Sequence, residues 1–457
     1  MKTKSKQDYS HIHAERVYDA RTLGKPRMLL LGLQFAFAMF SGNVIVALLT
    51  GLDTSLTILW AGLATLLFHF ITKGKVPVFL GGSFALLVGY QIIAPNAEPL
   101  LLMYAAAGMV VLGLVYVLIG QLIRIFGVDR VMSLFPPVVT APIIICIGAG
   151  MAVANVTSAA DNWLLAVIAL GVAMAVSMFG KGFFKLMPVL LGIVVSYIVG
   201  LCTNAVDFTP VKEAAWIGLP FAYEKTVFSI FGDNFDGGLL LSAILTVLPL
   251  GFASLVEHIG DIVAVGSACK KDFTKDPGLH RTLAGDGLGT AVAAAFGAPS
   301  NTTFTEGTAC LTLTNVYDPR IVRIAAVITA ILGFCPKLAG LVNSIPTGTL
   351  GGVMILMYGS LACVGFRSLV SNKVDFDNPR NQIIAGSIFI LAVGVRYGLP
   401  NGIELAIGNV GFSLSSIAVG AIVGILLNFV LPGRKKSAEL GNIDLDAGEQ
   451  QKAIEAE

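Results

Sequence analysis

Three carboxylates lie within otherwise apolar stretches of the chain. Glu257 and Asp261 occur in SLVEHIGDIV, and Glu306 occurs in APSNTTFTEG. The i, i+4 spacing of Glu257 and Asp261 puts both on one face of a helix. If these stretches cross a membrane, each carboxylate costs roughly 2.5–3.5 kcal/mol even on the lenient insertion scale, so such residues usually have a function. Because no Lys or Arg lies near them in the same segments, we expect them to hold protons, a cation or the donor groups of a ligand.

The neighbouring residues have structural alternatives. His258 is expected to pack against other helices or to face a polar neighbour rather than to bind a ligand. Glu257 could instead cap a neighbouring helix. Protonation of Glu306, or of the Glu257 and Asp261 pair, would lower the cost of a filled, dehydrated site, so we expect these three residues to take part in proton coupling.

Composition identifies the class of protein that holds these carboxylates. Of 457 residues, 55% are hydrophobic and 13% are charged, and the mean hydropathy is +0.82. These values predict an all-α polytopic membrane protein, since each helix needs about 20 apolar residues to cross the hydrocarbon layer. Residues 1–27 and 433–457 are polar and are expected to be cytosolic tails. Apolar windows predict membrane-spanning helices at 28–50, 55–73, 99–125, 135–155, 162–179, 184–202, 238–266, 280–298, 319–341, 345–371, 382–398 and 412–432.

Two further apolar segments are interrupted by proline, glycine or polar residues. They are VPVFLGGSFA at 76–85 and APSNTTFTEG at 298–307. Backbone groups inside lipid must be paired, and both segments contain short extended runs, so we expect an antiparallel pair of strands at the membrane midplane. Each strand would lead into a helix whose first N–H groups point at the site, and Ser83 and Thr305 are suitable N-cap residues. The donors would be the backbone N–H groups of Ser83, Phe84, Thr305 and Glu306.

The distribution of basic residues gives an orientation with both termini in the cytoplasm. It holds only if both interrupted segments also cross, which makes fourteen crossings in all. Seven crossings then separate the two interruptions, as expected for an inverted repeat. The cytoplasmic loops would carry the basic residues at 2–27, 73–75, 124–130, 181–185, 270–281, 320–323, 367–380 and 434–436.

Carboxylates beside amide-lined helix ends suit a neutral, planar ligand that both donates and accepts hydrogen bonds. The residues alone therefore predict a cation-coupled carrier of a small polar solute. An anion exchanger of the same architecture would need a basic residue at the site. An intramembrane enzyme would need a nucleophile and base or a metal cluster, and the spacing of His, Cys and Asp provides neither. No metal and no nucleic-acid partner is expected.

Five motifs give the chain a resemblance to the nucleobase–ascorbate transporters, also called nucleobase:cation symporter-2, and most of all to the bacterial uracil permeases in that family. They are KVPVFLGGSFA, ASLVEHIGDIV, KKDFTKDPGLHR, GAPSNTTFTEG and LMYGSLACVGFR. The resemblance implies fourteen segments in a seven-plus-seven inverted repeat, with a core domain at 28–125 and 238–341 and a gate domain at 135–202 and 345–432. It also implies a homodimer in the inner membrane that takes up a neutral nucleobase with protons and needs no other cofactor.

The resemblance also implies roles for individual residues. Glu257 would bind the base ring, Glu306 would be a second carboxylate, and the amides of Phe84 and Thr305, next to Ser83, would bind ring carbonyls. Tyr358 would approach from the gate. Uracil permeases tend to carry a histidine where this chain has Asp261, as xanthine-type members do. Asp261 thus favours a purine base, whereas the overall likeness favours uracil. The resemblance predicts uracil as substrate, with xanthine or another purine base as the alternative.

Overall fold

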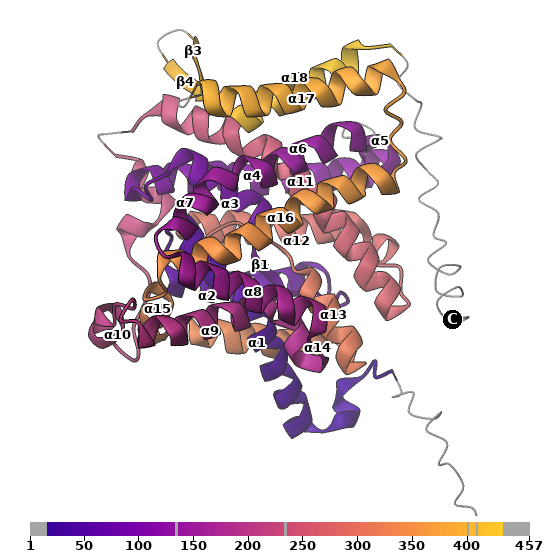
Figure 1. Ribbon diagram of the computed structural model, residues 1–457. Helices are drawn as coiled ribbons and strands as arrows, with labels where there is room; N and C mark the ends of the chain where they lie inside the picture. The colour runs from indigo at the N-terminus through magenta and orange to yellow at the C-terminus, as the bar shows by residue number, and fades with distance from the viewer. Residues whose placement is uncertain (1–15, 133–135, 233–234, 400–401, 408–409, 433–457) are drawn as a thin grey trace, which may run out of the picture.

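A computed structural model describes residues 16–132, 136–232, 235–399, 402–407 and 410–432, and this part of the chain is almost entirely helical (Figure 1). Its helices and strands, in chain order, are α1 (Lys25–Thr50), α2 (Thr54–Ile71), β1 (Leu80–Gly82), α3 (Phe84–Ile93), α4 (Pro99–Phe126), α5 (Val128–Met132), α6 (Pro137–Gly150), α7 (Ala152–Ala160), α8 (Trp163–Phe179), α9 (Pro188–Cys202), α10 (Thr209–Glu213), α11 (Gly237–Cys269), α12 (Leu279–Ala295), β2 (Asn301–Thr303), α13 (Thr305–Thr314), α14 (Pro319–Leu332), α15 (Pro336–Asn343), α16 (Thr347–Ser371), α17 (Pro379–Gly398), β3 (Ile403–Ile407), β4 (Val410–Leu414) and α18 (Ser416–Val430).

Each of the twelve predicted apolar windows contains a helix, and the chain is a multi-pass membrane protein. Among the described residues, seven helices are long and apolar enough to cross a bilayer, or eight if α14 and α15 form one span bent by 82°. This bend corrects the single helix predicted at 319–341. The helices α3, α8, α9 and α18 are apolar but have only 10–17 residues. The count of fourteen crossings therefore stays a prediction.

The helices pack in two sets. The first contains α1, α2, α4, α11, α12 and α14, and the second contains α6, α8, α9, α16, α17 and α18. Small residues allow the closest approaches. A Cβ on Gly113 of α4 would lie 2.7 Å from the backbone nitrogen of Ala291 of α12, and one on Gly148 of α6 would lie 2.6 Å from the carbonyl oxygen of Tyr358 of α16. Glycine at such contacts lets helix backbones touch, as is common between membrane helices.

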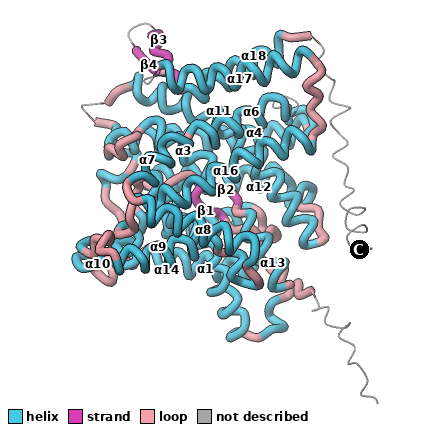
Figure 2. Tube along the Cα trace, viewed as in Figure 1, coloured by secondary structure: helices cyan, strands magenta, loops and turns pink. Residues whose placement is uncertain are grey.

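The two interruptions pair as an antiparallel two-stranded sheet, which confirms the prediction. Leu80 lies opposite Thr303 and Gly82 opposite Asn301, and Figure 2 shows the two short strands near the centre of the molecule. Strand β1 consists of Leu-Gly-Gly at 80–82, slightly later in the chain than residues 76–80, which we expected to form the strand. The N–H of Gly82 donates to Oδ1 of Asn43 at 3.0 Å, so an α1 side chain pairs part of the outer edge of this strand.

Two features of the fold were not predicted. Strands β3 and β4 form an antiparallel hairpin before α18. Residues 16–24, assigned to the cytosolic tail, lie against the folded chain: Val17 bridges Val316, and the N–H of Ala20 donates to Oδ2 of Asp318 at 2.7 Å. The remaining predicted tail residues, 1–15 and 433–457, lie outside the described residues.

Candidate functional site

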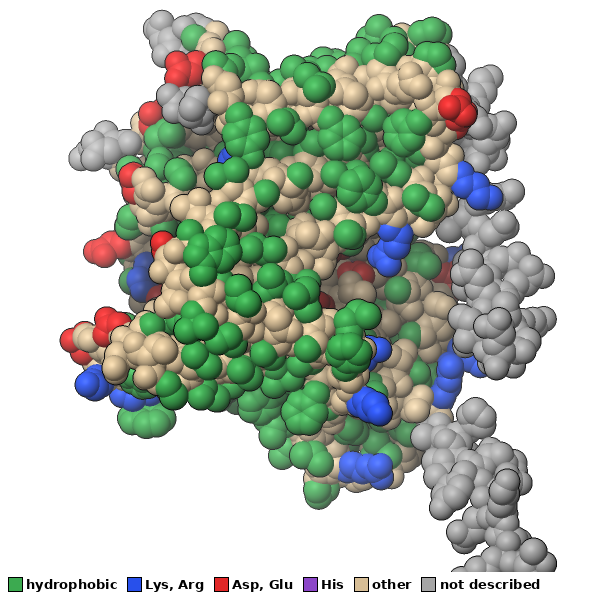
Figure 3. Space-filling view, viewed as in Figure 1, with side chains coloured by type: hydrophobic (Ala, Val, Ile, Leu, Met, Phe, Trp, Pro, Cys, Tyr) green, Lys and Arg blue, Asp and Glu red, His purple; other side chains and the backbone are tan. Residues whose placement is uncertain are grey.

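Glu257 and Asp261 lie on the wall of one cavity, as their helical spacing predicted. The cavity measures about 400 Å³ and lies between α11, the starts of α3 and α13, and the facing sides of α6 and α16. Figure 3 shows a hollow with acidic side chains inside it and Lys or Arg side chains around it. The residues that line the cavity include Ala85, Ile144, Ile147, Glu257, Asp261, Thr305, Leu361, Val364, Arg367, Ser368 and Ser371.

Asp261 ties α11 to the second interruption. Its Oδ2 accepts a hydrogen bond from the hydroxyl of Thr303 at 2.7 Å, and its Oδ1 accepts one from the hydroxyl of Thr305 at 2.8 Å. Only 7% of the residue is exposed. Hydrogen bonds to a charged acceptor are among the strongest in proteins, so Asp261 holds both the end of β2 and the start of α13 in place.

The start of α3 is built by Ser83. Its Oγ accepts from the N–H of Leu86 at 3.3 Å, which makes it the predicted N-cap. Its own N–H donates to the carbonyl of Ser300 at 2.9 Å, so the prediction that this N–H is a free donor was wrong. The N–H of Phe84, in the first turn, makes no hydrogen bond within the described part of the chain.

The start of α13 differs from its prediction. Phe304, and not Thr305, is the N-cap residue, because the Thr305 hydroxyl bonds to Asp261 instead of capping its own helix. Phe304 stacks on Phe84, with ring centroids 6.5 Å apart and an angle of 13° between the planes. The two aromatic rings beside the helix ends therefore cover each other in this state. Both helices nevertheless start next to the cavity.

Glu306 and Tyr358 lie near the cavity but are not among its lining residues. Glu306 follows Thr305 in the first turn of α13, its side chain is exposed, and it interacts electrostatically with Glu257 and Asp261. Tyr358 is 4% exposed, and its hydroxyl donates to Oε1 of Gln91 at 2.9 Å. This bond joins α16 to the C-terminal part of α3.

His258 points away from the cavity, and the prediction that it faces a polar neighbour is confirmed. Its Nδ1 lies 3.2 Å from Oδ2 of Asp286 on α12, and neither side chain is exposed. Asp286 is a fourth carboxylate that the sequence reasoning missed. The signal was present, since Asp286 lies in LAGDGLGT within a predicted membrane-spanning window, like Glu257 and Asp261 in theirs.

Arg367 corrects the expectation that no basic residue lies close to the carboxylates. It belongs to the last turns of α16 and lines the same cavity as Glu257 and Asp261. No ion pair joins Arg367 to either carboxylate among the residues the structure describes. The cavity therefore has an acidic wall on α11 and a basic residue near the end of α16.

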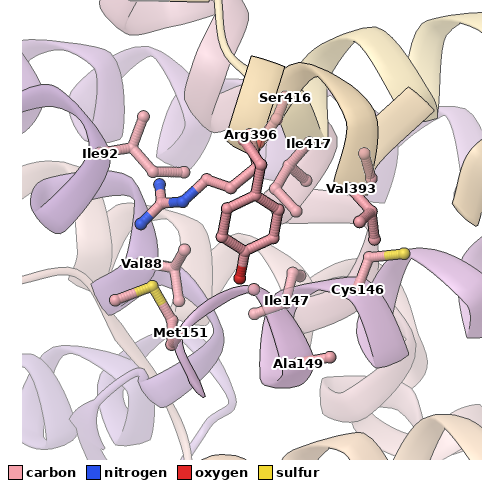
Figure 4. Close-up of a pocket in the computed structure, with 13 residues that line it drawn as sticks. Val88, Ile92, Cys146, Ile147, Ala149, Met151, Val393, Arg396, Ser416 and Ile417 are labelled. Carbon is pink, nitrogen blue, oxygen red and sulfur yellow. The ribbon is translucent and has the colours of Figure 1, made fainter. Parts of the chain in front are cut away.

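A second cavity, of about 250 Å³, lies on the other side of α6. It is lined mainly by apolar residues of α3, α6, α17 and α18, and the Arg396 side chain extends into it toward Ile92 (Figure 4). Ile147 lines both cavities, so α6 forms the wall between them.

Comparison with known proteins identifies the family. The model of the Permease family (Xan_ur_permease) matches residues 26–400. The chain belongs to this family. Its members are transporters, so the chain is a permease and not an enzyme. It is 38% identical over 429 residues to the "Probable uracil permease" of Haemophilus influenzae, covering 92% of this chain and 98% of that protein. It is 34% identical to the "Uracil permease" of Bacillus subtilis, covering 88% of this chain and 92% of that one.

Two further comparisons extend this result. The "Putative pyrimidine permease" of Escherichia coli K12 is 34% identical, with 88% of each chain covered. Among solved structures, the transmembrane domain of the cyanobacterial bicarbonate transporter BicA matches the permease with a TM-score of 0.60 at 14% identity, covering 90% of this chain and 99% of that one. At that identity the likeness shows the fold alone.

Proposed function

We propose that this permease is a proton-coupled symporter that takes up a neutral nucleobase, and that the base is uracil. One observation carries the proposal: two carboxylates of α11 and the amide-bearing starts of α3 and α13 face a single cavity of about 400 Å³. That volume is within the range typical of sites for small organic ligands. The proposal is supported by the relatives named uracil permease.

The base would bind between the two helix starts and α11. Glu257 would accept from ring N–H groups, while the free N–H of Phe84 and that of Thr305 would donate to ring carbonyls. Ser83 would act through its cap on α3, and Glu306 would supply a second carboxylate from the first turn of α13. Asp261, with both oxygens already accepting hydrogen bonds, would fix the start of α13 for this contact.

We also propose the fourteen-segment, seven-plus-seven inverted repeat, with the first helix set as a core domain at 28–125 and 238–341 and the second as a gate domain at 135–202 and 345–432. The antiparallel pairing of β1 with β2 supports it, because an inverted repeat brings equivalent segments together from opposite sides. The similarity in fold to a bicarbonate transporter domain is consistent with this architecture.

In the proposed orientation, the structure corresponds to an inward-open state. The cavity extends from Glu257 along α16 to Arg367 and Ser371, the end that precedes a loop predicted to be cytoplasmic. On the opposite side, the bond from Tyr358 to Gln91 links the proposed gate to the proposed core. Transport would then move the core against the gate and connect the base to the second cavity beside Arg396.

Two alternatives are weighed by specific residues. Asp261 favours xanthine or another purine base, because xanthine-type members carry aspartate there. Arg367 and the fold of the bicarbonate transporter favour an anion. An anion in this cavity, however, would lie beside Glu257 and Asp261 and would be repelled by their negative charges. A neutral base avoids this repulsion.

A binding screen with purified protein tests the substrate. Uracil is expected to bind more tightly than xanthine and bicarbonate, and Glu257→Gln is expected to abolish binding, because the amide loses the negative charge and has one acceptor oxygen in place of two. Glu213→Gln, on the exposed helix α10, is the matched control and should bind normally. Unchanged uracil affinity in Glu257→Gln would refute the site, and tighter binding of xanthine would replace the substrate.

Proteoliposomes test the coupling ion. One charge moved through 100 mV supplies about 2.3 kcal/mol, which is comparable to the cost of one buried carboxylate, so a single proton suffices. We expect an imposed pH gradient to drive uracil accumulation and uracil to cause proton uptake. Accumulation driven by a Na⁺ gradient without a pH change would overturn proton coupling. We further propose an inner-membrane homodimer with both termini in the cytoplasm. The mass of the detergent-solubilised protein tests the dimer, and reporter fusions at each terminus test the orientation.

A further inference from the structure

A buried imidazole and carboxylate lie behind the cavity and have no part in the proposed binding of the base. Nδ1 of His258 on α11 and Oδ2 of Asp286 on α12 are 3.2 Å apart, and both side chains are 0% exposed. Neither side chain has a further hydrogen-bond partner among the described residues. A pair so isolated from water is costly unless its two groups compensate each other.

The surroundings of the pair are acidic. Asp286 interacts electrostatically with Glu257 and Asp261 on α11, and with Tyr116 on α4. The Tyr116 hydroxyl donates to the carbonyl of Gly251 at 2.5 Å and also interacts with Glu257. Strand β2 has no titratable side chain, and the buried His69 of α2 places its Nε2 2.9 Å from the carbonyl oxygen of Val78. His258 thus approaches these carboxylates from within the first helix set, while Arg367 faces Glu257 and Asp261 across the cavity from α16.

This arrangement holds one proton. An imidazolium with a carboxylate and an imidazole with a carboxylic acid contain the same number of protons, and both are neutral overall. Loss of that proton leaves Asp286 negative beside Glu257 and Asp261 in a dry environment, which is strongly unfavourable unless water in the cavity screens the charge. A base that enters the cavity displaces this water, so base binding and protonation of the pair favour each other.

We propose that His258 and Asp286 hold the coupling proton of the transport cycle. The proton comes from cavity water when the base binds and returns to cavity water when the base leaves, and Glu257, which lines the cavity and interacts electrostatically with Asp286, is the nearest titratable group on this route. Only N–H and O–H bonds form and break. The proposal rests on the proposed function, because a coupling proton presupposes a proton-driven carrier.

The test separates uphill uptake from exchange in the same vesicles. A driving force of 100 mV corresponds to about 2.3 kcal/mol, or about 50-fold accumulation. Asp286→Asn mimics the protonated carboxyl. In this variant we expect base-for-base exchange to remain and base-induced proton uptake to vanish. The ratio of internal to external base concentration should fall to about 1. Asp286→Glu should restore accumulation. Thr282→Val, which removes a buried hydroxyl one turn earlier on α12, is the control and should keep both fluxes.

Three outcomes would overturn the proposal. Accumulation that persists in Asp286→Asn would show that the proton is held elsewhere. Loss of both fluxes in folded Asp286→Asn would show that the pair serves binding or structure, and so would failure of both Asp286→Asn and the double variant His258→Asn/Asp286→Asn to fold. Failure of the proposed function is distinguishable, because the unsubstituted protein itself would then lack base exchange or pH-driven accumulation.

Discussion

The hydroxyl groups of Thr303 and Thr305 both donate to Asp261, and substitutions of these residues test how much the hydrogen bonds stabilise β2 and the start of α13. Thr303→Val replaces a side chain that is 2% exposed with one of the same shape and removes one hydrogen bond to a carboxylate. Such a bond contributes about 1.5–3 kcal/mol, so the variant should lose that much free energy of unfolding. Thr305→Val should cost less, toward the lower end of this range, because Thr305 is exposed to the cavity.

The assay is denaturant unfolding in detergent, combined in a double-mutant cycle with Asp261→Ala. Once the carboxylate is absent, the buried Thr303 hydroxyl has lost its acceptor, so Thr303→Val should then cost nothing or stabilise the protein. Thr302→Val is the control, since among the described residues its hydroxyl takes part only in a long 3.4 Å contact with Ser254. If Thr303→Val costs the same with and without Asp261, the hydrogen bond is not what holds β2.

Three further predictions concern the first interruption, the N-terminal segment and the proposed outer closure. Gly82→Ala should destabilise the protein by about 1–3 kcal/mol in the same unfolding assay, because its Cβ would lie 2.6 Å from Cγ1 of Val46, and Val46→Ala should recover only part of this loss, because the Cβ of Val46 itself would lie 2.8 Å away. Asp318→Ala should speed tryptic cleavage within residues 16–24 about tenfold, since it removes the acceptor of the Ala20 N–H at a cost near 1.4 kcal/mol; unchanged cleavage would mean that the segment is held by other contacts. Tyr358→Phe removes the hydrogen bond to Gln91, so it should speed the labelling of Cys146 in the second cavity by an impermeant thiol reagent applied from outside. The exposed Cys202 and Cys363 are replaced by serine for this assay. An unaltered labelling rate would show that the bond to Gln91 does not close the outer side.

The sequence predicted the pairing of the interruptions because its signals are local. Proline and paired glycines break the helical pattern within a few residues, and the need to pair backbone groups in lipid leaves few other solutions. Ser83 was recognised as an N-cap because capping also depends on residues within one turn of the helix start. The helical spacing of Glu257 and Asp261 fixed their common face without any knowledge of the neighbouring helices.

What could not be predicted depends on how helices distant in the sequence are rotated and packed. The hydroxyl of Thr305 could either cap its own helix or reach another element, and only the position of α11 makes Asp261 its partner. Likewise, His258 and Asp286 meet because α11 presents one face to the cavity and another to α12. Arg367 lies in the predicted helix 345–371 but was counted among the residues of the cytoplasmic side, and only the packing of α16 against the cavity shows that it lines the same cavity as Glu257.

The position of α11 explains why substrate and proton would be coupled. Successive helical residues point about 100° apart, so Glu257 can face the cavity while His258 faces α12. Two carboxylates about 6 Å apart repel by about 3 kcal/mol at an effective dielectric constant of 20, and Asp286 adds to this repulsion. When a base donates to Glu257 and excludes water, the negative charge of Asp286 becomes more unfavourable. A proton on the His258–Asp286 pair neutralises that charge. Coupling in this permease would then follow from the charge density around one helix, without a separate coupling device.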